Sequence, residues 1–291
     1  MFRLGVVSFL NARPLIEGLS PQTGVEVRFD VPARLPALLD GGAVHAALIP
    51  IVDILRRVGE YSVVSDACIG CDGETMTVRV FSQTPPDRVR RLWVDGDSHT
   101  SVALAQVLWR ELYDRALTVE PLAAGQPPLD ELEAVLLIGD KVVSPKRGSF
   151  AYEVDLGGAW RQHTGLPFVF AVWATVASGP CGGRGKAMGP RRRPQGADAT
   201  GETLAELLGR ARDRGVARAA EIAAEHGPAH GWPVALAERY LTRCMRYQLD
   251  ARAIAGANLF ARLCAREGLV PMDAVVSWPN GPQRQPASVT P

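Results

Sequence analysis

The sequence predicts an α/β fold of two lobes with a ligand cleft between them. Strand and helix patterns alternate over residues 3–81 and again over residues 92–174, which is typical of α/β sheets. Each unit also contains a polar elbow, at residues 8–11 and 95–101, that follows a strand pattern and leads into a helix pattern. Since each unit carries one elbow, we expect the two elbows to grip a small anion from opposite lobes.

The first unit is predicted from short apolar runs bounded by glycine, proline and aspartate, which are typical of buried parallel strands. These runs predict strands at Arg3–Val7, Val25–Phe29, Ala46–Ile49, Tyr61–Ser65 and Met76–Phe81. The segments between them predict helices at Ala12–Gly18, Leu35–Asp40 and Ile51–Val58.

The second unit contains an amphipathic helix, predicted at Ser101–Leu112 from apolar residues at helical spacing. Strands are predicted at Leu92–Val94, Leu117–Glu120, Ala134–Ile138 and Phe168–Ala174, and the last of these leads back to the first lobe. The remaining periodic segments predict helices at Thr203–Arg214, Val216–Glu225, Pro233–Tyr240 and Ala253–Glu267.

These elements predict a second lobe inserted into the first. We expect the first lobe to comprise residues 1–80 and 174–280 and the second lobe residues 81–173. Residues 178–201 are rich in glycine and arginine and almost without large apolar side chains, so we expect a mobile surface insertion there. Residues 281–291 predict a disordered tail.

The composition excludes several classes of protein. The 291 residues carry a net charge of +1, so no overall field favours nucleic acid or a membrane surface. No apolar run is long enough to predict a membrane helix. No secretory signal pattern is visible, and we therefore expect a cytoplasmic protein. The oligomeric state is left open.

The five cysteines are an odd number, which argues against a disulfide framework in a chain of this kind. Cys68 and Cys71 have the C-x-x-C spacing of redox sites and half zinc sites. We favour two buried small residues, because no second pair completes four metal ligands. His226 and His230 lie four residues apart, but Gly227 and Pro228 break the helix that a zinc site would need.

The two elbows supply the main candidate binding residues. Ser8 and Asn11 follow the first strand, just before a predicted helix. In the second elbow, Ser98, Thr100 or Ser101 can cap the next helix, whose free N–H groups can then bind a carboxylate or phosphate. The alternative is that these hydroxyl groups act only as helix caps.

Weaker candidates lie at other strand ends. Gly70 and Thr77 belong to a polar turn where glycine allows a close approach of the backbone to a ligand. Asp140 follows a buried strand, a position where open α/β sheets often contact ligands. No nucleotide-binding glycine motif and no serine-hydrolase elbow is present. The sequence therefore predicts no cofactor and no metal.

Motifs spread over residues 3–270 resemble the chorismate dehydratase family of the futalosine route to menaquinone. The matching segments occur in order along the chain: Val7–Leu15, Ala47–Pro50, Cys68–Gly70, Asp72–Gly73, Asp97–Leu104, Leu137–Asp140, Asp155–Gly157 with Trp160, Thr164–Ala174, Tyr240–Leu241 and Tyr247–Leu249.

This resemblance implies a type 2 periplasmic-binding-protein-like fold. It also implies a lyase that dehydrates chorismate, a dicarboxylate, to 3-(1-carboxyvinyloxy)benzoate without a cofactor. The implied substrate-binding residues are Ser8, Asn11, Gly70, Thr77, Ser98, His99, Thr100, Ser101 and Asp140. Asn11 is the implied catalytic residue, and it would position a substrate carboxylate that takes the proton.

The chain departs from the family pattern at three places. His99 stands where many relatives have arginine, Met76–Thr77 replaces an Arg-Ser pair, and residues 178–201 are longer than the usual connection. Two alternatives therefore stay open. One is the sister dihydroxynaphthoate synthase of the same pathway, which is expected to use a histidine base. The other is a non-catalytic binder of a small carboxylate.

Overall fold

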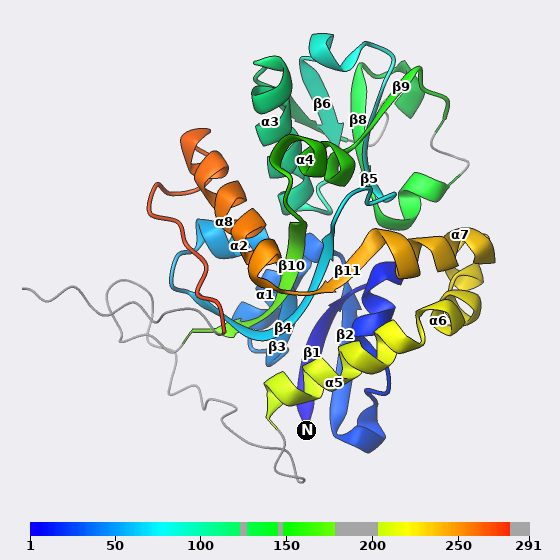
Figure 1. Cartoon of the computed structure of the whole chain (residues 1–291), viewed down its shortest axis with the longest axis vertical. Helices are drawn as coiled ribbons and strands as arrows, with labels where there is room; N and C mark the ends of the chain where they lie inside the picture. Colours follow the sequence, from blue (N-terminus) through cyan, green and yellow to red (C-terminus); the bar gives the residue numbers. More distant parts are fainter. Residues whose placement is uncertain (123–126, 145–147, 178–202, 280–291) are drawn as a thin grey trace, which may run out of the picture.

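The computed structural model describes residues 1–122, 127–144, 148–177 and 203–279. Two β-sheets form two lobes, one above the other in Figure 1. The expected α/β architecture is confirmed. Residues 178–201 and 281–291, for which we predict an insertion and a tail, lie outside the described residues.

The first sheet has six strands in the order β11-β4-β10-β3-β1-β2. β1 pairs in parallel with β2 and β3, whereas β10 is antiparallel to β3 and β4, and β11 is antiparallel to β4. The strands are β1 (Phe2–Val7), β2 (Val25–Asp30), β3 (Ala46–Pro50), β4 (Tyr61–Cys71), β10 (Phe168–Val176) and β11 (Met245–Gln248).

Helices pack on this sheet and shield its apolar side chains from water. α1, α2 and α8 contact β10, and α5 contacts β4 and the 3₁₀ segment η1 (Leu10–Ile16). The helices of this lobe are α1 (Leu35–Asp40), α2 (Ile51–Arg56), α5 (Leu204–Ala217), α6 (Ala219–His226), α7 (Val234–Arg239) and α8 (Ala251–Arg266).

The second sheet has five strands in the order β7-β6-β8-β5-β9. β6 pairs in parallel with β7 and β8, and β5 is antiparallel to β8 and β9. The elements are β5 (Val78–Ser82), β6 (Arg91–Val94), α3 (His99–Tyr113), β7 (Thr118–Pro121), β8 (Ala134–Ile138), β9 (Tyr152–Asp155) and α4 (Leu156–Thr164).

Short 3₁₀ turns connect these elements. They are η2 (Pro21–Thr23), η3 (Pro32–Arg34), η4 (Pro86–Arg88), η5 (Leu129–Glu131), η6 (Gly139–Val143) and η8 (Pro228–His230). A π-helical turn, η9 (Tyr240–Cys244), joins α7 to β11.

The chain crosses between the lobes twice. It leaves the first sheet after Cys71 and enters the second at Val78, and it returns between Thr164 and Phe168. We therefore propose that the lobes divide at residues 72–77 and 165–167. The boundaries expected at residues 80 and 173 fall inside β5 and β10, because strand pairing could not be foreseen from local patterns.

Three sequence predictions need correction. β4 runs to Cys71 rather than Ser65, and it is antiparallel to β10 because β4 leads into the second lobe and β10 returns from it; β11 is antiparallel to β4 as well. The segment after β1 is a 3₁₀ turn rather than an α-helix at Ala12–Gly18, and Pro14 lies inside it without an N–H to donate. β9, α4 and β11 are absent from the sequence predictions.

Within the described residues, no helix is both long enough and apolar enough to cross a membrane.

The packing of α5 on η1 yields a stability prediction. A Cβ atom at Gly215 would lie 1.8 Å from the carbonyl oxygen of Pro14, whereas a Cβ at Gly209 in the same helix would meet nothing closer than 4.0 Å. We expect Gly215→Ala to lower the free energy of unfolding by about 1–3 kcal/mol. The control Gly209→Ala is expected to raise it by up to about 1 kcal/mol, because alanine favours helix. Urea denaturation measures both, and equal stabilities would contradict the packing described.

Candidate functional site

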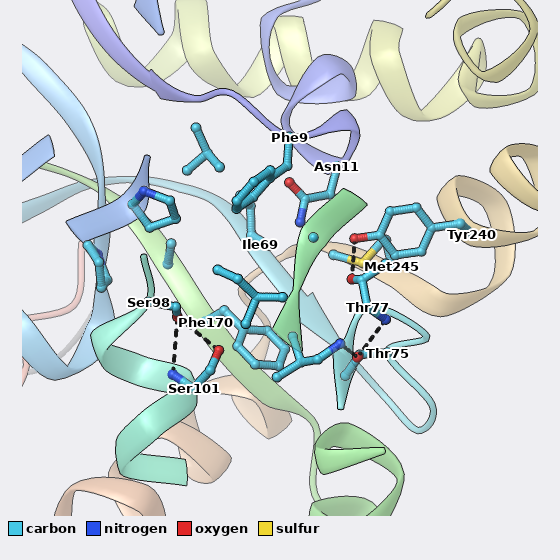
Figure 2. A pocket seen from close by; sticks show the side chains of 17 residues that line it. Phe9, Asn11, Ile69, Thr75, Thr77, Ser98, Ser101, Phe170, Tyr240 and Met245 are labelled. Atoms are coloured by element: carbon cyan, nitrogen blue, oxygen red, sulfur yellow. Dashed lines mark hydrogen bonds between the residues drawn. The ribbon is translucent and has the colours of Figure 1, made fainter. Parts of the chain in front are cut away.

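A cavity of about 520 Å³, in part open to solvent, lies between the two sheets. Both lobes and the segment after α7 contribute to its wall, which Figure 2 shows from close by. The lining residues are Val7, Phe9, Asn11, Pro32, Pro50, Ile69, Thr75, Thr77, Val78, Ser98, Ser101, Ile138, Gly139, Phe170, Ala171, Tyr240 and Met245.

The middle of the cavity is apolar. Phe9, Ile69 and Phe170 all come from the first lobe, the last of them from β10. Figure 2 shows these three side chains between two groups of polar side chains, which are described next. A flat apolar ring in a ligand can pack against such side chains.

One polar group lies at the N-terminus of α3. Ser98 is the N-cap residue, and its Oγ accepts a hydrogen bond from the N–H of Ser101 at 3.2 Å. The Ser98 hydroxyl also donates to Oγ of Ser101 at 2.8 Å. Backbone N–H groups and the helix dipole make this end of a fifteen-residue helix favourable for a carboxylate.

The neighbouring Thr100 and His99 face away from the cavity and connect the lobes. The Thr100 hydroxyl donates to the carbonyl oxygen of Phe170 at 3.2 Å and accepts from the N–H of Val52 at 3.3 Å. Nδ1 of His99 lies 2.8 Å from the carboxylate of Asp53 in α2. Neither residue lines the cavity. Their hydrogen bonds run from α3 of the second lobe to α2 and β10 of the first lobe, so both residues join the lobes.

The second polar group comprises Asn11, Thr77 and Tyr240. Oγ1 of Thr77 lies 2.7 Å from the hydroxyl oxygen of Tyr240, and both side chains are about 1% exposed. Asn11 lies beside them in Figure 2. Its Oδ1 is buried and has no hydrogen-bond partner among the described residues, so this oxygen can accept a hydrogen bond from a ligand, whereas a ligand carboxylate can be bound only through the amide NH₂ group.

The cavity is nearly free of ionisable groups. Among the described residues that line it, Tyr240 alone has an ionisable side chain. Burial raises the pKa of Tyr240 well above its usual range, although hydrogen bonds from Thr77 and Asn11 oppose this shift. An anionic ligand would therefore be bound by neutral donors, and the part of the lining that the structure describes offers no carboxylate, imidazole or amine as a base.

Three other candidates from the sequence, Ser8, Gly70 and Asp140, lie outside the lining of the cavity. Ser8 does not line the cavity, although its neighbours Val7 and Phe9 do. The 3₁₀ turn after it has no side-chain cap, and the N–H of Ala12 bonds to the carbonyl oxygen of Phe9 at 3.2 Å. Gly70 is required by packing instead, since a Cβ there would lie 2.7 Å from the carbonyl oxygen of Phe168.

Asp140 connects the end of β8 to the helical segment of the first lobe. Its carboxylate lies 2.7 Å from Nδ1 of His230 and accepts a hydrogen bond from Nε1 of Trp232 at 2.8 Å. Asp140 is thus engaged by two side chains of the other lobe and does not line the cavity.

The model of the menaquinone biosynthesis family matches residues 2–266 of the chain. The chain belongs to this family. A curated relative, the chorismate dehydratase of Thermus thermophilus, is 27% identical over 274 residues, which cover 89% of this chain and 93% of the relative. The family resemblance predicted from the sequence motifs is confirmed.

Solved structures similar to this family member share its fold. A protein of Archaeoglobus fulgidus superposes with a TM-score of 0.62 at 15% identity, covering 92% of this chain and 98% of that one. The periplasmic aliphatic sulphonate binding protein SsuA of Escherichia coli has a TM-score of 0.56 at 14% identity, with 93% of each chain covered. The expected periplasmic-binding-protein-like fold is confirmed.

Five residues that line the cavity were not identified from the sequence: Phe9, Thr75, Phe170, Tyr240 and Met245. Tyr240, Phe9 and Phe170 lie in segments that carried the resemblance, but aromatic residues at such positions look like ordinary core. The sequence signal that could have indicated Tyr240 is its position at the end of a predicted helix. In the structure Tyr240 begins the π-helical turn, and its hydroxyl group lies next to Thr77.

The cysteine and histidine patterns do not form a metal or redox centre in the described residues. Cys68 and Cys71 are buried in β4, and burial raises the pKa of the Cys68 thiol to about 12. A thiol with such a pKa stays protonated and unreactive at neutral pH. Cys181 lies outside the described residues.

The contacts of Asp140 yield a second stability prediction. We expect Asp140→Ala to lower the free energy of unfolding by about 1–3 kcal/mol, because the Trp232 indole and the His230 ring lose their acceptor. The control Asp273→Ala changes an exposed carboxylate and is expected to stay within about 0.5 kcal/mol of the wild type. Urea denaturation compares the variants, and similar stabilities would show that the Asp140 contacts do not join the lobes.

Proposed function

We propose that the chain is a chorismate dehydratase, a lyase that converts chorismate to 3-(1-carboxyvinyloxy)benzoate and water. The observation that carries this proposal is the cavity itself, which has neutral donors in two groups, an apolar middle and Tyr240 as its one ionisable side chain among the described residues. The relative from Thermus thermophilus bears the name of this activity, and the family acts in menaquinone biosynthesis.

Chorismate has two carboxylates joined through a six-membered ring, and each part has a counterpart in the cavity. The ring carboxylate would lie at the N-terminus of α3, where Ser98 and Ser101 line the wall. The ring would pack between Phe9 and Phe170. The enolpyruvyl carboxylate would then lie near Asn11, at the other polar group.

The reaction needs little from the protein beyond orientation and a proton route. Loss of the proton at C3 and of the hydroxyl group at C4 makes the ring aromatic, and aromatisation drives the elimination. The described residues that line the cavity include no carboxylate, imidazole or amine that could serve as a base. We therefore propose that the enolpyruvyl carboxylate of the substrate takes the C3 proton, and that the side-chain NH₂ group of Asn11 donates to this carboxylate and positions it.

The sister dihydroxynaphthoate synthase is less well supported. A histidine base is expected for that enzyme, but no described residue that lines the cavity is a histidine. Two histidines could be considered for the role of base, but each already contacts a carboxylate: His99 bonds to Asp53, and His230 bonds to Asp140. Ser8, Gly70, Thr100, His99 and Asp140 are accordingly proposed to support the site rather than to touch the substrate.

The first test is an assay of the purified protein with chorismate and without added cofactor, followed by chromatography and mass spectrometry. We expect loss of one water and formation of an aromatic enol-ether acid. The rate is expected to show no essential enzyme group near about pH 6–7, the range of histidine. Tight binding of chorismate without turnover would favour a binding protein. If chorismate is neither converted nor bound, the protein is neither a chorismate dehydratase nor a chorismate-binding protein.

Asn11→Asp tests the position of the substrate. A carboxylate at residue 11 would repel the dicarboxylate, and at an effective dielectric constant of about 20 this repulsion lowers kcat/KM at least about tenfold. The control Asn258→Asp makes the same change outside the cavity, where Oδ1 accepts from Trp278 and the new carboxylate can still accept. Full activity of Asn11→Asp would remove Asn11 from the site.

A further inference from the structure

Tyr240 is the one ionisable side chain among the described residues that line the cavity. It can therefore give up its proton as well as donate a hydrogen bond, and the reaction steps proposed so far do not involve it. Its hydroxyl oxygen lies 2.7 Å from Oγ1 of Thr77, in a wall that also contains Asn11. It comes from a π-helical turn, an irregular conformation that is frequent at functional sites.

The ring of Tyr240 is held rigidly. It stacks on the indole of Trp232 with ring centroids 4.8 Å apart and an interplanar angle of 12°. Nε1 of Trp232 in turn donates to the carboxylate of Asp140 at 2.8 Å. Because Asp140 belongs to the second lobe and Tyr240 to the first, this stack fixes the phenol while the lobes are in contact.

Thr77 is held just as firmly from the other side. Its N–H bonds to Oγ1 of Thr75 at 3.2 Å, and its carbonyl oxygen accepts from the N–H of Gly139 at 2.9 Å. The preceding Met76 has a φ of 64°, an uncommon value for a residue with a side chain. Such strain persists only where the surroundings impose it, and it is frequent at functional sites.

The other hydroxyl groups of the lining are engaged or lie elsewhere. Oγ1 of Thr75 accepts hydrogen bonds from the N–H groups of Thr77 and Val78. Ser98 and Ser101 bond to each other at the end of α3, on the far side of the apolar residues in Figure 2. The hydroxyl groups of Thr77 and Tyr240 therefore form the pair that lies beside Asn11 in Figure 2.

We propose that Tyr240 is the general acid of the dehydration, protonating the C4 hydroxyl group as it departs, and that Thr77 orients the phenol for this step. This inference rests on the proposed function and adds a catalytic residue to it. Chorismate holds its C4 hydroxyl group next to the carbon that carries the enolpyruvyl group, so a substrate with that group at Asn11 brings its C4 oxygen towards the same wall.

The step balances in atoms and charge. The C3–H bond breaks and its electron pair forms the new C3–C4 double bond, while the proton goes to the enolpyruvyl carboxylate. The C4–O bond breaks with its electron pair on oxygen, and the Tyr240 phenol gives that oxygen a proton, so that water leaves. The proton on the enolpyruvyl carboxyl group then returns to the phenolate, and the net products are the aromatic dianion and water.

The surroundings of Tyr240 suit an acid rather than a base. Burial and the charge of Asp140 raise its pKa, and the thiol of Cys244 acts in the same direction, while the hydrogen bonds of Thr77 and Asn11 lower it. The phenol therefore stays protonated through the neutral range, and as a weak acid it gives its proton only to a stronger base, such as the hydroxide that departs from C4. The hydrogen bonds of Thr77 and Asn11 also stabilise the phenolate that the transfer leaves for a moment.

The main test compares Tyr240→Phe with Tyr247→Phe. Both tyrosines are buried, but Tyr247 does not line the cavity, and its hydroxyl has no hydrogen-bond partner among the described residues. We expect Tyr240→Phe to lower kcat by about 10²–10⁴-fold with a much smaller change in KM, as for loss of a general acid. Tyr247→Phe is expected to keep the activity of the wild type.

Binding of the reaction product separates catalysis from structure. The product lacks the C4 oxygen, so removal of an acid that acts on this oxygen should leave the inhibition constant of the product unchanged. A merely structural role of Tyr240 would weaken product binding together with kcat. Thr77→Val is expected to lower kcat, and Thr77→Ser, which keeps the hydroxyl group, is expected to restore most of it.

Each outcome decides one claim. If the wild type does not dehydrate chorismate, the proposed function is wrong, and the role of Tyr240 falls with it. If the wild type is active and Tyr240→Phe keeps kcat within about twofold, the function stands and the acid is not Tyr240. If Tyr240→Phe loses product binding as much as activity, Tyr240 shapes the cavity and does not transfer the proton.

Discussion

The carboxylate of Asp155 holds the segment on which the whole cavity depends. It accepts hydrogen bonds from the N–H groups of Thr75 at 2.9 Å, Met76 at 2.8 Å and Gly158 at 2.9 Å. The first two lie in the crossing from the first lobe to the second, and the third is in the first turn of α4, the helix that leads to the return crossing. One half-buried side chain thus caps a helix and fixes a strained turn, and Thr77 is placed as a result.

Contacts between the lobes surround the cavity and use side chains that do not line it. Thr100 bonds to the backbone of both Val52 and Phe170, His99 bonds to Asp53, and Asp140 bonds to His230 and Trp232. In the second elbow, Thr100 and His99 therefore join the lobes while their neighbours Ser98 and Ser101 line the cavity, and at the end of β8 Asp140 joins the lobes while Gly139 lines the cavity. This explains how a nearly uncharged cavity is assembled from segments rich in polar residues.

The part of the site that is local in sequence could be predicted, and the part made by distant pairs could not. Ser98 and Ser101 follow from the rules of helix capping, which involve residues three apart. Tyr240 and Thr77 are 163 positions apart, and no local pattern indicates that they meet. Asp140 was correctly placed at the end of a buried strand, but its partners come from the other lobe. The two-lobed fold was predictable because alternating strand and helix patterns recur on both sides of the crossing.

If the proposed function holds, a cavity whose described lining includes no carboxylate, imidazole or amine selects its substrate in two stages. The helix terminus and the apolar walls discriminate by fit, and they would accept many ring carboxylates of similar size. In the proposed mechanism, however, the reagent that begins the reaction is part of the substrate, so a ligand that fits but lacks the side-chain carboxylate would occupy the cavity and remain intact. Fidelity then depends on the reactivity of the small molecule itself, because the described residues that line the cavity include no carboxylate, imidazole or amine that could act as a base on another ligand.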